Sequence, residues 1–299
     1  MTAGYSVGIA AYNEAANIGR LLDRLVSHGP ASWGPAEVLV VASGCTDATE
    51  AIVRARAERD GRIRLMVEPE RRGKASAVNL LIARAAGDPL VLMSADVLPQ
   101  GDAVARLIEP FADKGVGVTA GRIMPENDPK AFMGFYANLF WSLHHRVALQ
   151  GFKAGEVVAF RRVFESIPGD TATDETWIVQ RVLEKGLASR YVPEAVFRNR
   201  GPDNVRDFLK VRRRHLAGYH HLRKLRPDWR LPDTMDNRKV LKLLRAEISE
   251  NGMNPAFLAG SLLLELWARL LARFDFQVAK KNHCVWETAD STKRLSGEG

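Results

Sequence analysis

Cysteine is nearly absent from this chain of 299 residues. Cys45 and Cys284 are its two cysteines, too few for a disulfide framework or a cysteine metal site. A basic and then apolar leader is missing from the first residues, so no signal peptide is expected. These absences favour a reducing cytoplasm as the compartment of the protein.

Metal-ligand spacing is missing among the seven histidines. His144-His145 and His220-His221 are adjacent pairs whose members diverge on a helix, which favours surface positions over a shared ligand site. Internal repeats and low-complexity linkers are missing as well. A chain of this length can bury a large core, as one domain or as one domain with an appendage.

Acidic residues are scarce in one region. Between residues 198 and 245, 15 Lys and Arg stand against 5 Asp and Glu, although the whole chain carries a net charge of only +8. An anionic partner is therefore expected there, and a diphosphate or an anionic lipid surface would fit. Nucleic acid ranks last and is not expected as a partner, because no base-stacking aromatic residues alternate with the basic ones.

Strand and helix patterns alternate from the N-terminus. Short apolar runs at residues 7–10, 37–41, 63–67 and 90–94 predict strands, and the amphipathic segments between them predict helices. This alternation indicates an α/β fold with a mostly parallel, doubly wound sheet flanked by helices. Farther along, the sequence predicts strands at 116–124 and 157–160 and helices at 101–112, 130–150, 174–185 and 205–226.

The apolar run at residues 90–94 is followed closely by a single carboxylate, Asp96. Ligands of parallel sheets collect beyond the carboxyl ends of the strands, so Asp96 is placed to hold Mg²⁺ or Mn²⁺ against a diphosphate. The alternative is an aspartate that stabilises a turn before Pro99.

Several motifs that are weak alone occur in a meaningful order. Ala11-Tyr12-Asn13-Glu14 ends the first expected strand, and Ala42-Ser43-Gly44-Cys45-Thr46-Asp47 ends the second. Residues 73–79 read Gly-Lys-Ala-x-Ala-x-Asn, and residues 94–96 read Ser-Ala-Asp. Next come a glycine turn with a strand at residues 154–162, and then the sequence Thr-Asp-Glu-Thr-Trp at residues 173–177. With these motifs, the chain resembles the family-2 inverting glycosyltransferases over residues 6–226.

This resemblance implies a GT-A catalytic domain, here residues 1–230, followed by an amphipathic helical appendage, residues 231–299. It implies a nucleoside diphosphate sugar as the donor, with UDP-sugar favoured, and Mn²⁺ or Mg²⁺ as the cofactor, bound at Asp96. The residues implied at the donor are Ala11, Tyr12, Asn13, Glu14, Ser43, Lys74, Ala95 and Asp96. Lys74 follows a glycine at a helix start, which suits anion binding, although an isolated lysine there would more often be solvated.

Two positions depart from the family pattern. Ala42-Ser43 replaces the acidic pair that contacts base and ribose in many members, and Ser94 replaces the first Asp of the Asp-x-Asp motif. Asp96 is then the one carboxylate left in that motif, so the metal would take its other ligands from diphosphate and water. A catalytically silent nucleotide-sugar-binding or scaffold protein is the alternative function.

Inverting transfer needs a base for the acceptor hydroxyl. Asp174 and Glu175 are adjacent carboxylates at an expected helix N-terminus, where the helix dipole favours ionisation and their mutual repulsion opposes it. The resemblance implies that Glu175 is the catalytic base and Asp174 its partner. An acidic first helical turn with no catalytic role is the alternative.

The acceptor and diphosphate side of the site is expected at Gly155, Arg212, Arg213 and Arg214. Family members often carry a Gln-x-x-Arg-Trp motif near here, and Arg213-Arg214-His215 lacks both its Gln and its Trp, which argues against a processive polysaccharide synthase. Arg212 falls on the apolar face of its helix, so it either points inward at phosphate or extends out to water.

Residues 255–274 predict a long helix in the appendage, after a shorter helix that Asp236 could cap. Ser261, Glu265, Arg269 and Arg273 form one narrow polar stripe, and the rest of the surface is apolar. Three charges make a membrane span improbable by composition. A helix lying in the bilayer surface, a homodimer contact or packing within the chain are the alternatives. The resulting expectation is an enzyme that is peripheral at the cytoplasmic membrane face and acts on a lipid-linked acceptor.

Overall fold

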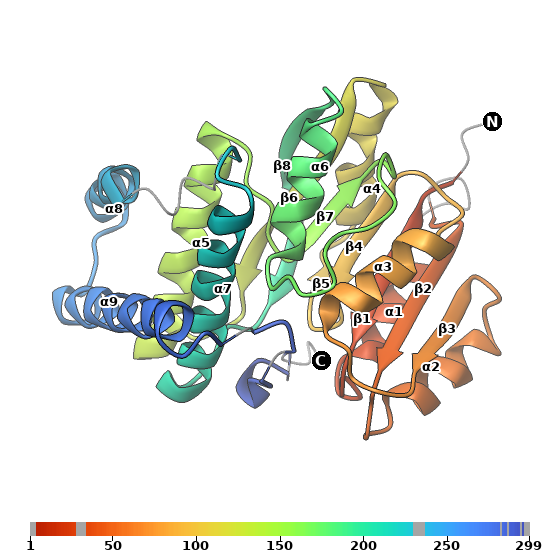
Figure 1. Cartoon of the computed structure of the whole chain (residues 1–299), viewed down its shortest axis with the longest axis horizontal. Coiled ribbons are helices and arrows are strands. Elements are labelled where there is room, and N and C mark those ends of the chain that lie inside the picture. Colours follow the sequence, from red (N-terminus) through yellow and green to blue (C-terminus); the bar gives the residue numbers. More distant parts are fainter. Residues whose placement is uncertain are drawn as a thin grey trace.

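The computed structural model describes residues 4–27, 34–229, 237–281, 283–285, 287–293 and 295. Its centre is one sheet, flanked by helices on both faces, with a further group of helices at one end (Figure 1). The capping role expected for Asp236 lies outside the described residues.

Eight strands of the described chain form the sheet in the order β3-β2-β1-β4-β7-β6-β8-β5. Their bounds are β1 Ser6–Ala11, β2 Glu37–Ser43, β3 Ile63–Glu68, β4 Leu90–Ser94, β5 Leu98–Pro99, β6 Val116–Pro125, β7 Val157–Phe160 and β8 Ala188–Asn199.

The first four strands pair in parallel, with Ile9 of β1 between Val40 of β2 and Met93 of β4. β1, β2 and β4 are buried on both faces, as their unbroken apolar sequences require in a parallel sheet covered by helices. The expected α/β fold is confirmed. The carboxyl ends of these three strands meet at one edge of the sheet, and this edge positions the site.

The second half of the sheet is mixed. β7 runs antiparallel to both β4 and β6, while β8 runs parallel to β6. The sequence did not predict β8, because Pro193 interrupts its alternation of polar and apolar residues. Residues 193–195 form an irregularity in its pairing with β6, which is where a proline is tolerated in a sheet.

The helices are α1 Ile18–Ser27, α2 Thr49–Ala57, α3 Lys74–Arg84, α4 Ala103–Ile108, α5 Phe132–Gln150, α6 Asp174–Leu183, α7 Val205–Leu225, α8 Asn237–Asn251 and α9 Pro255–Gln277. α1, α2 and α4 bury their apolar residues on one face of the sheet, and α3 and α6 on the other. The helix expected at 101–112 ends at Ile108 and continues as a 3-10 helix, in which Pro110 has no N–H to donate. In α5, His144 is buried rather than on the surface, and its Nε2 lies 3.1 Å from the Ala154 carbonyl oxygen.

α5, α7, α8 and α9 form the group of helices at the left of Figure 1. Phe208 and Leu216 of α7 share an apolar cluster with Ala268 and Ala272 of α9, so residues on both sides of the expected boundary at residue 230 pack together. In α8 the buried leucines are Leu243 and Leu244, whereas Leu241 is exposed. The division into two domains stays a prediction.

Candidate active site

A cavity of about 300 Å³ lies at the carboxyl ends of β1, β2 and β4. The N-termini of α3 and α6, the helices α5 and α7 and the loop before β7 complete its walls. Among the predicted site residues, those that line it are Ala11, Tyr12, Glu14, Ser43, Lys74, Ala95, Asp96, Gly155, Glu175, Arg212 and Arg214. Asn13, Asp174 and Arg213 are not part of its lining.

The turns after β1 and β2 are joined to each other. Asn13, in the left-handed conformation with φ of 52°, donates from Nδ2 to Thr46 Oγ1 at 3.0 Å and accepts from the Thr46 N–H at 2.7 Å. Asn13 therefore shapes the turn, and its neighbours Tyr12 and Glu14 face the cavity. The guanidinium of Arg71 lies 3.7 Å from the centroid of the Tyr12 ring, which places a cation against the aromatic face.

Lys74 links two helices across the cavity. Its Nζ lies 2.8 Å from both Asp174 Oδ2 and Glu175 Oε1. Gly73 precedes it with φ of 93°, a conformation that favours glycine, and a side chain there would meet the Cys284 carbonyl oxygen. The predicted base Glu175 faces the cavity, while its partner Asp174 is almost completely buried behind it.

The pKa values of the two carboxyl groups move apart. Burial and the charge of Glu175 raise the pKa of Asp174 to about 6, although Lys74 opposes the shift. Burial also acts to raise the pKa of Glu175, but the charge and hydrogen bond of Lys74 outweigh it, so the pKa of Glu175 is lowered. Glu175 is therefore held as a carboxylate that faces the cavity.

Three further carboxyl groups gather opposite this pair: Glu14, Asp96 and Glu156. Burial and the charge of Asp96 raise the pKa of Glu14 to about 7 and that of Glu156 to about 8. Burial also raises the pKa of Asp96, against the opposing charges of Lys293, Lys74 and Arg214. The sequence reasoning missed Glu156 as a site residue. It accepts from Asn199 Nδ2 at 2.8 Å, and its place beside the glycine turn is the signal that could have identified it.

These three groups suit a hard divalent cation, because all their donor atoms are carboxyl oxygens and a bound cation would favour their ionised forms. The described residues contain no group of three His, Cys, Asp or Glu side chains already arranged to hold a metal ion. A cation at Asp96 would then need oxygen ligands from a bound diphosphate and water.

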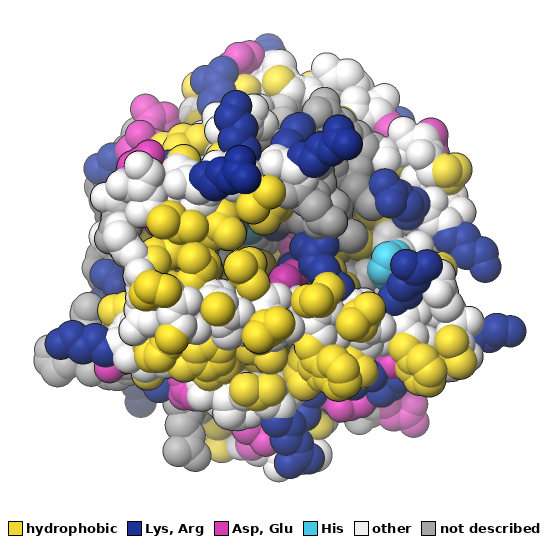
Figure 2. Space-filling view, turned by 90° about the vertical axis from the view of Figure 1, so that its left-hand side faces the viewer, with side chains coloured by type: hydrophobic (Ala, Val, Ile, Leu, Met, Phe, Trp, Pro, Cys, Tyr) yellow, Lys and Arg dark blue, Asp and Glu magenta, His cyan; other side chains and the backbone are white. Residues whose placement is uncertain are grey.

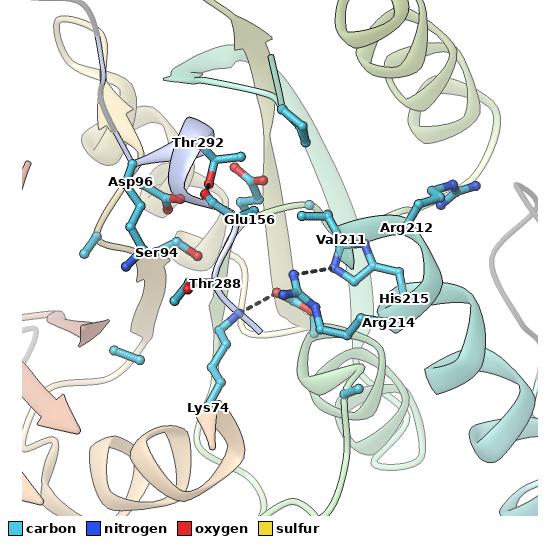
Figure 3. Close-up of a pocket in the computed structure, with 18 of the residues that line it drawn as sticks. Lys74, Ser94, Asp96, Glu156, Val211, Arg212, Arg214, His215, Thr288 and Thr292 are labelled. Carbon is cyan, nitrogen blue, oxygen red and sulfur yellow. Dashed lines mark hydrogen bonds and ion pairs between the residues drawn. The ribbon is translucent and has the colours of Figure 1, made fainter. Parts of the chain in front are cut away.

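The three arginines of α7 separate. Arg214 is buried and directed into the cavity near Lys74, whereas Arg212 turns away (Figure 3). Burial lowers the pKa of Arg214 to about 10, and the charges of Glu175 and Asp174 offset part of this shift. Arg214 is thus the cation of the three that reaches the predicted diphosphate region.

Arg212 neither reaches inward to phosphate nor extends to water. Its Nε and Nη2 donate to the two carboxylate oxygens of Glu265 in α9, both at 2.7 Å. Arg213 forms the same kind of pair with Asp275, at 2.9 and 2.6 Å. The prediction that Arg213 contacts acceptor or diphosphate is wrong, because its guanidinium is bound to Asp275. A short-range motif cannot reveal such a partner on a distant helix.

Two groups of cavity residues carried no signal in the sequence. Lys153, in the loop before β7, lines the cavity, and burial with the nearby charge of Arg212 lowers its pKa to about 7. Residues 287–293 also border the cavity, through Glu287, Thr288, Ala289, Thr292 and Lys293. Contacts between residues so far apart in the sequence leave no periodic pattern.

Comparison with known proteins identifies the family. The family model "Glycosyl transferase family 2" matches residues 6–164, and "Glycosyl transferase family group 2" matches residues 90–275. The chain belongs to glycosyl transferase family 2. The predicted family and enzyme class are thereby confirmed.

Individual relatives agree with this assignment. An N-acetylglucosaminyltransferase of Rhizobium meliloti (strain 1021) is 26% identical over 200 residues, which cover 59% of this chain and 46% of that protein. The chain thus spans less than half of the length of this curated relative. A mannosyltransferase from Pyrobaculum calidifontis, solved in complex with GDP-Man and Mn²⁺, is 25% identical with a TM-score of 0.65, covering 94% of this chain and 89% of that one.

A more distant structure shares the fold. The glucosyl-3-phosphoglycerate synthase of Mycobacterium tuberculosis is 20% identical with a TM-score of 0.50, covering 72% of this chain and 79% of that one. The predicted GT-A fold is confirmed by these neighbours.

Proposed function

We propose that this protein is a metal-dependent inverting glycosyltransferase that moves a sugar from a nucleoside diphosphate sugar to an acceptor hydroxyl. The observation that carries this proposal is that one cavity is lined both by Glu175, held ionised by Lys74, and by Asp96 just beyond the end of β4. A base and an anion-binding region on opposite walls are what such a displacement needs.

The donor diphosphate fits beside the N-terminus of α3. Backbone N–H groups at this end attract anions, and Lys74 and Arg214 add positive charge within the cavity. Asp96 would hold Mn²⁺ or Mg²⁺, with Glu14 and Glu156 close by, and the bound cation would neutralise charge on the departing diphosphate. The Mn²⁺ in the Pyrobaculum calidifontis mannosyltransferase complex supports this choice.

Glu175 supplies the base. Its carboxylate removes the proton of the acceptor hydroxyl while the hydroxyl oxygen forms a bond to the anomeric carbon. The bond from that carbon to the diphosphate oxygen breaks on the opposite face, which inverts the configuration. Lys74 orients the carboxylate at 2.8 Å, and Asp174 in turn holds Lys74 at 2.8 Å.

The acceptor is proposed to be lipid-linked and to meet the protein at the cytoplasmic membrane face. α9 presents an apolar surface, whose most exposed side chains are Leu262, Leu263, Leu266, Trp267, Leu270 and Phe274. Figure 2 shows this band of apolar side chains below a hollow in which acidic and basic side chains are visible. An apolar surface beside the cavity would let an acceptor head enter while its lipid stays in the bilayer.

By length and composition, α9 is the one described helix that could span a membrane, and only 17% of its most apolar stretch is buried in the protein. Its protein-facing side, however, carries polar groups that are already paired: Glu265 holds Arg212, and the buried Asp275 holds Arg213, whereas Arg273 of the expected polar stripe is exposed. Crossing a bilayer would break these pairs, so we propose that α9 lies in the plane of the membrane surface. A homodimer through the same apolar face is the other arrangement that this exposure favours.

A donor panel with Mn²⁺ tests the proposed reaction. UDP-sugars are tried first, and GDP-mannose is included because the Pyrobaculum calidifontis neighbour was solved with GDP-Man. The expected result is metal-dependent transfer with an inverted anomeric configuration, read by NMR. Donor binding without transfer or hydrolysis would instead favour the catalytically silent nucleotide-sugar-binding protein, and retention of configuration would exclude the inverting mechanism.

A further inference from the structure

Residues 287–293, here called the C-terminal strap, border the cavity beside the turn that follows β1. Figure 3 shows Thr288 and Thr292 of the strap in the same region as Asp96 and Glu156. No residue of the strap belongs to the motifs that predicted the site.

The strap is tied to helices on both sides of the cavity. On the α7 side, Lys210 Nζ donates to the Thr288 carbonyl oxygen at 2.9 Å, and Ser291 Oγ donates to Asp207 Oδ2 at 2.8 Å. At the other end, Asn17 Nδ2 donates to the Lys293 carbonyl oxygen at 2.7 Å. These bonds fix the backbone of the strap and so determine where the side chain of Lys293 can reach.

The ammonium of Lys293 binds the turn that follows β1. It donates to the carbonyl oxygens of Tyr12 and Asn13, the latter at 2.9 Å, and lies 3.0 Å from Glu14 Oε1. An ammonium has three N–H donors, and here three oxygens of consecutive residues receive them. Lys293 is 280 positions away from Asn13 in the sequence. The cation that binds this turn is therefore supplied by the strap.

The turn is one that needs such support. Asn13 adopts the left-handed conformation, which non-glycine residues adopt at a cost in free energy, and its carbonyl oxygen points at the ammonium. Tyr12 and Glu14 on either side both line the cavity. Lys293 also brings positive charge to the wall where Glu14 and Asp96 face each other.

We propose that Lys293 is a positioning residue of the donor site, which holds residues 12–14 in the conformation that receives the nucleoside diphosphate. This inference rests on the proposed function and adds to it a part of the chain outside the family motifs. Lys293 acts through the turn, since its donors are already bound to protein oxygens. Its loss is therefore expected to affect donor binding and to leave the Lys74–Glu175 pair in place.

The test compares Lys293→Gln with Lys114→Gln. Lys114 is exposed and belongs neither to the cavity lining nor to the strap, so it controls for the loss of one positive charge. Donor affinity is measured by calorimetry with Mn²⁺, and KM and kcat by turnover. We expect Lys293→Gln to weaken donor affinity by about 10- to 100-fold, the size of an effect from losing hydrogen bonds to a charged group.

Further expected results separate positioning from a general structural role. In Lys293→Gln the donor KM rises while kcat stays within about threefold, and Lys293→Arg recovers part of the donor affinity. Ser291→Ala, which loosens the strap without removing the ammonium, is expected to give a smaller loss in the same direction. Melting curves of all variants establish that the fold is retained.

Two results for Lys293→Gln overturn the inference. Unchanged donor affinity would mean that the strap takes no part in the site, and tighter binding of Mn²⁺ or donor would mean that Lys293 obstructs it. If the unmodified protein itself binds no nucleoside diphosphate sugar, the proposed function fails, and the role of Lys293 fails with it. Binding by the unmodified protein is therefore measured first.

Discussion

The carboxyl groups in and behind the cavity wall form two groups, which differ in the cations that balance their charge. Asp174 and Glu175 share Lys74, with both distances at 2.8 Å. Glu14, Asp96 and Glu156 are gathered by the ends of β1 and β4 and the loop before β7, and of these Glu14 has the closest cation, Lys293. The first group holds an ionised base in place, whereas the second keeps carboxyl groups with raised pKa values at a place where a bound cation would favour their ionised forms.

The difference shows that burial alone does not decide the state of a carboxyl group. Burial acts to raise the pKa of Glu175 and of Glu156, yet Lys74 brings the pKa of Glu175 below its usual range while that of Glu156 rises to about 8. One well-placed ammonium thus separates a fixed carboxylate from one that holds a proton near neutral pH. The predictions below test this division.

The largest effect is expected from the second group. Asp96→Asn replaces a carboxylate by a neutral amide, a poor ligand for a hard cation, and should abolish turnover while leaving the fold intact. Transfer rate at saturating Mn²⁺ and a melting curve are the two measurements. Turnover equal to that of the unmodified protein would remove Asp96 from the metal site.

Glu175→Gln tests the first group. Because the amide cannot accept the acceptor proton, kcat should fall by about 10² to 10⁴, while donor affinity stays nearly unchanged. Asp174→Asn is the matched control, with the same chemical change one residue away on the buried side of Lys74. If Asp174→Asn gives the large loss in kcat and Glu175→Gln does not, the two roles are reversed.

The proposed acceptor location extends the comparison to α9, in which Glu265 and Asp275 are paired with arginines of α7 while the apolar face is exposed. The full-length protein is expected to co-sediment with anionic vesicles, since each buried Å² of apolar surface contributes roughly 25 cal/mol. Nearby basic residues would add about 1 kcal/mol per charge, so salt should weaken the binding only in part.

Leu266→Glu with Leu270→Glu should abolish this vesicle binding. Leu241→Glu with Leu225→Glu changes two exposed leucines outside α9 and serves as the control. An α9 that forms only a homodimer would give a different result: no vesicle binding at any salt concentration, and a double variant that elutes as a monomer on a sizing column.

The smallest effect concerns pH. Glu156 has a folded-state pKa of about 8, above its usual value of 4.5, so the folded state holds more protons than the unfolded state between these values. Its contribution to stability is complete below about pH 4.5 and is lost as the pH rises through about 8. Between pH 6 and pH 9, the melting temperature of Glu156→Gln should therefore decrease less than that of the unmodified protein.

Lys153 makes the comparison with this variant necessary. Burial lowers its pKa to about 7, so above that pH it favours the folded state increasingly, in the opposite direction. The difference between the unmodified protein and Glu156→Gln isolates the carboxyl group. Equal slopes in the two proteins would show that Glu156 is already ionised in this pH range.

Local patterns predicted much of this molecule. The strands β1, β2 and β4 were predicted because their residues are apolar on both faces, and their ends placed Tyr12, Asp96 and Ser43 at one edge of the sheet. Lys74 and Glu175 came from motifs at helix starts, where a short sequence determines the local geometry.

Features that depend on long-range contacts were not predicted. Pro193 breaks the alternating pattern of β8, and the irregularity that accommodates it lies in the pairing with β6, far away in the sequence. The partners of Arg212 and Arg213 lie about 53 and 62 residues away, on α9, and that of Lys293 lies at the opposite end of the chain. A motif of three to six residues contains no information on such partners.

The most direct test of the division between the two groups is donor binding, measured by calorimetry with and without Mn²⁺ in three proteins. The unmodified protein and Glu175→Gln are expected to bind the donor with equal affinity that depends on Mn²⁺. Asp96→Asn is expected to lose this metal dependence. Mn²⁺-dependent binding that survives in Asp96→Asn and disappears in Glu175→Gln would contradict the assignment of cation and base to these two groups.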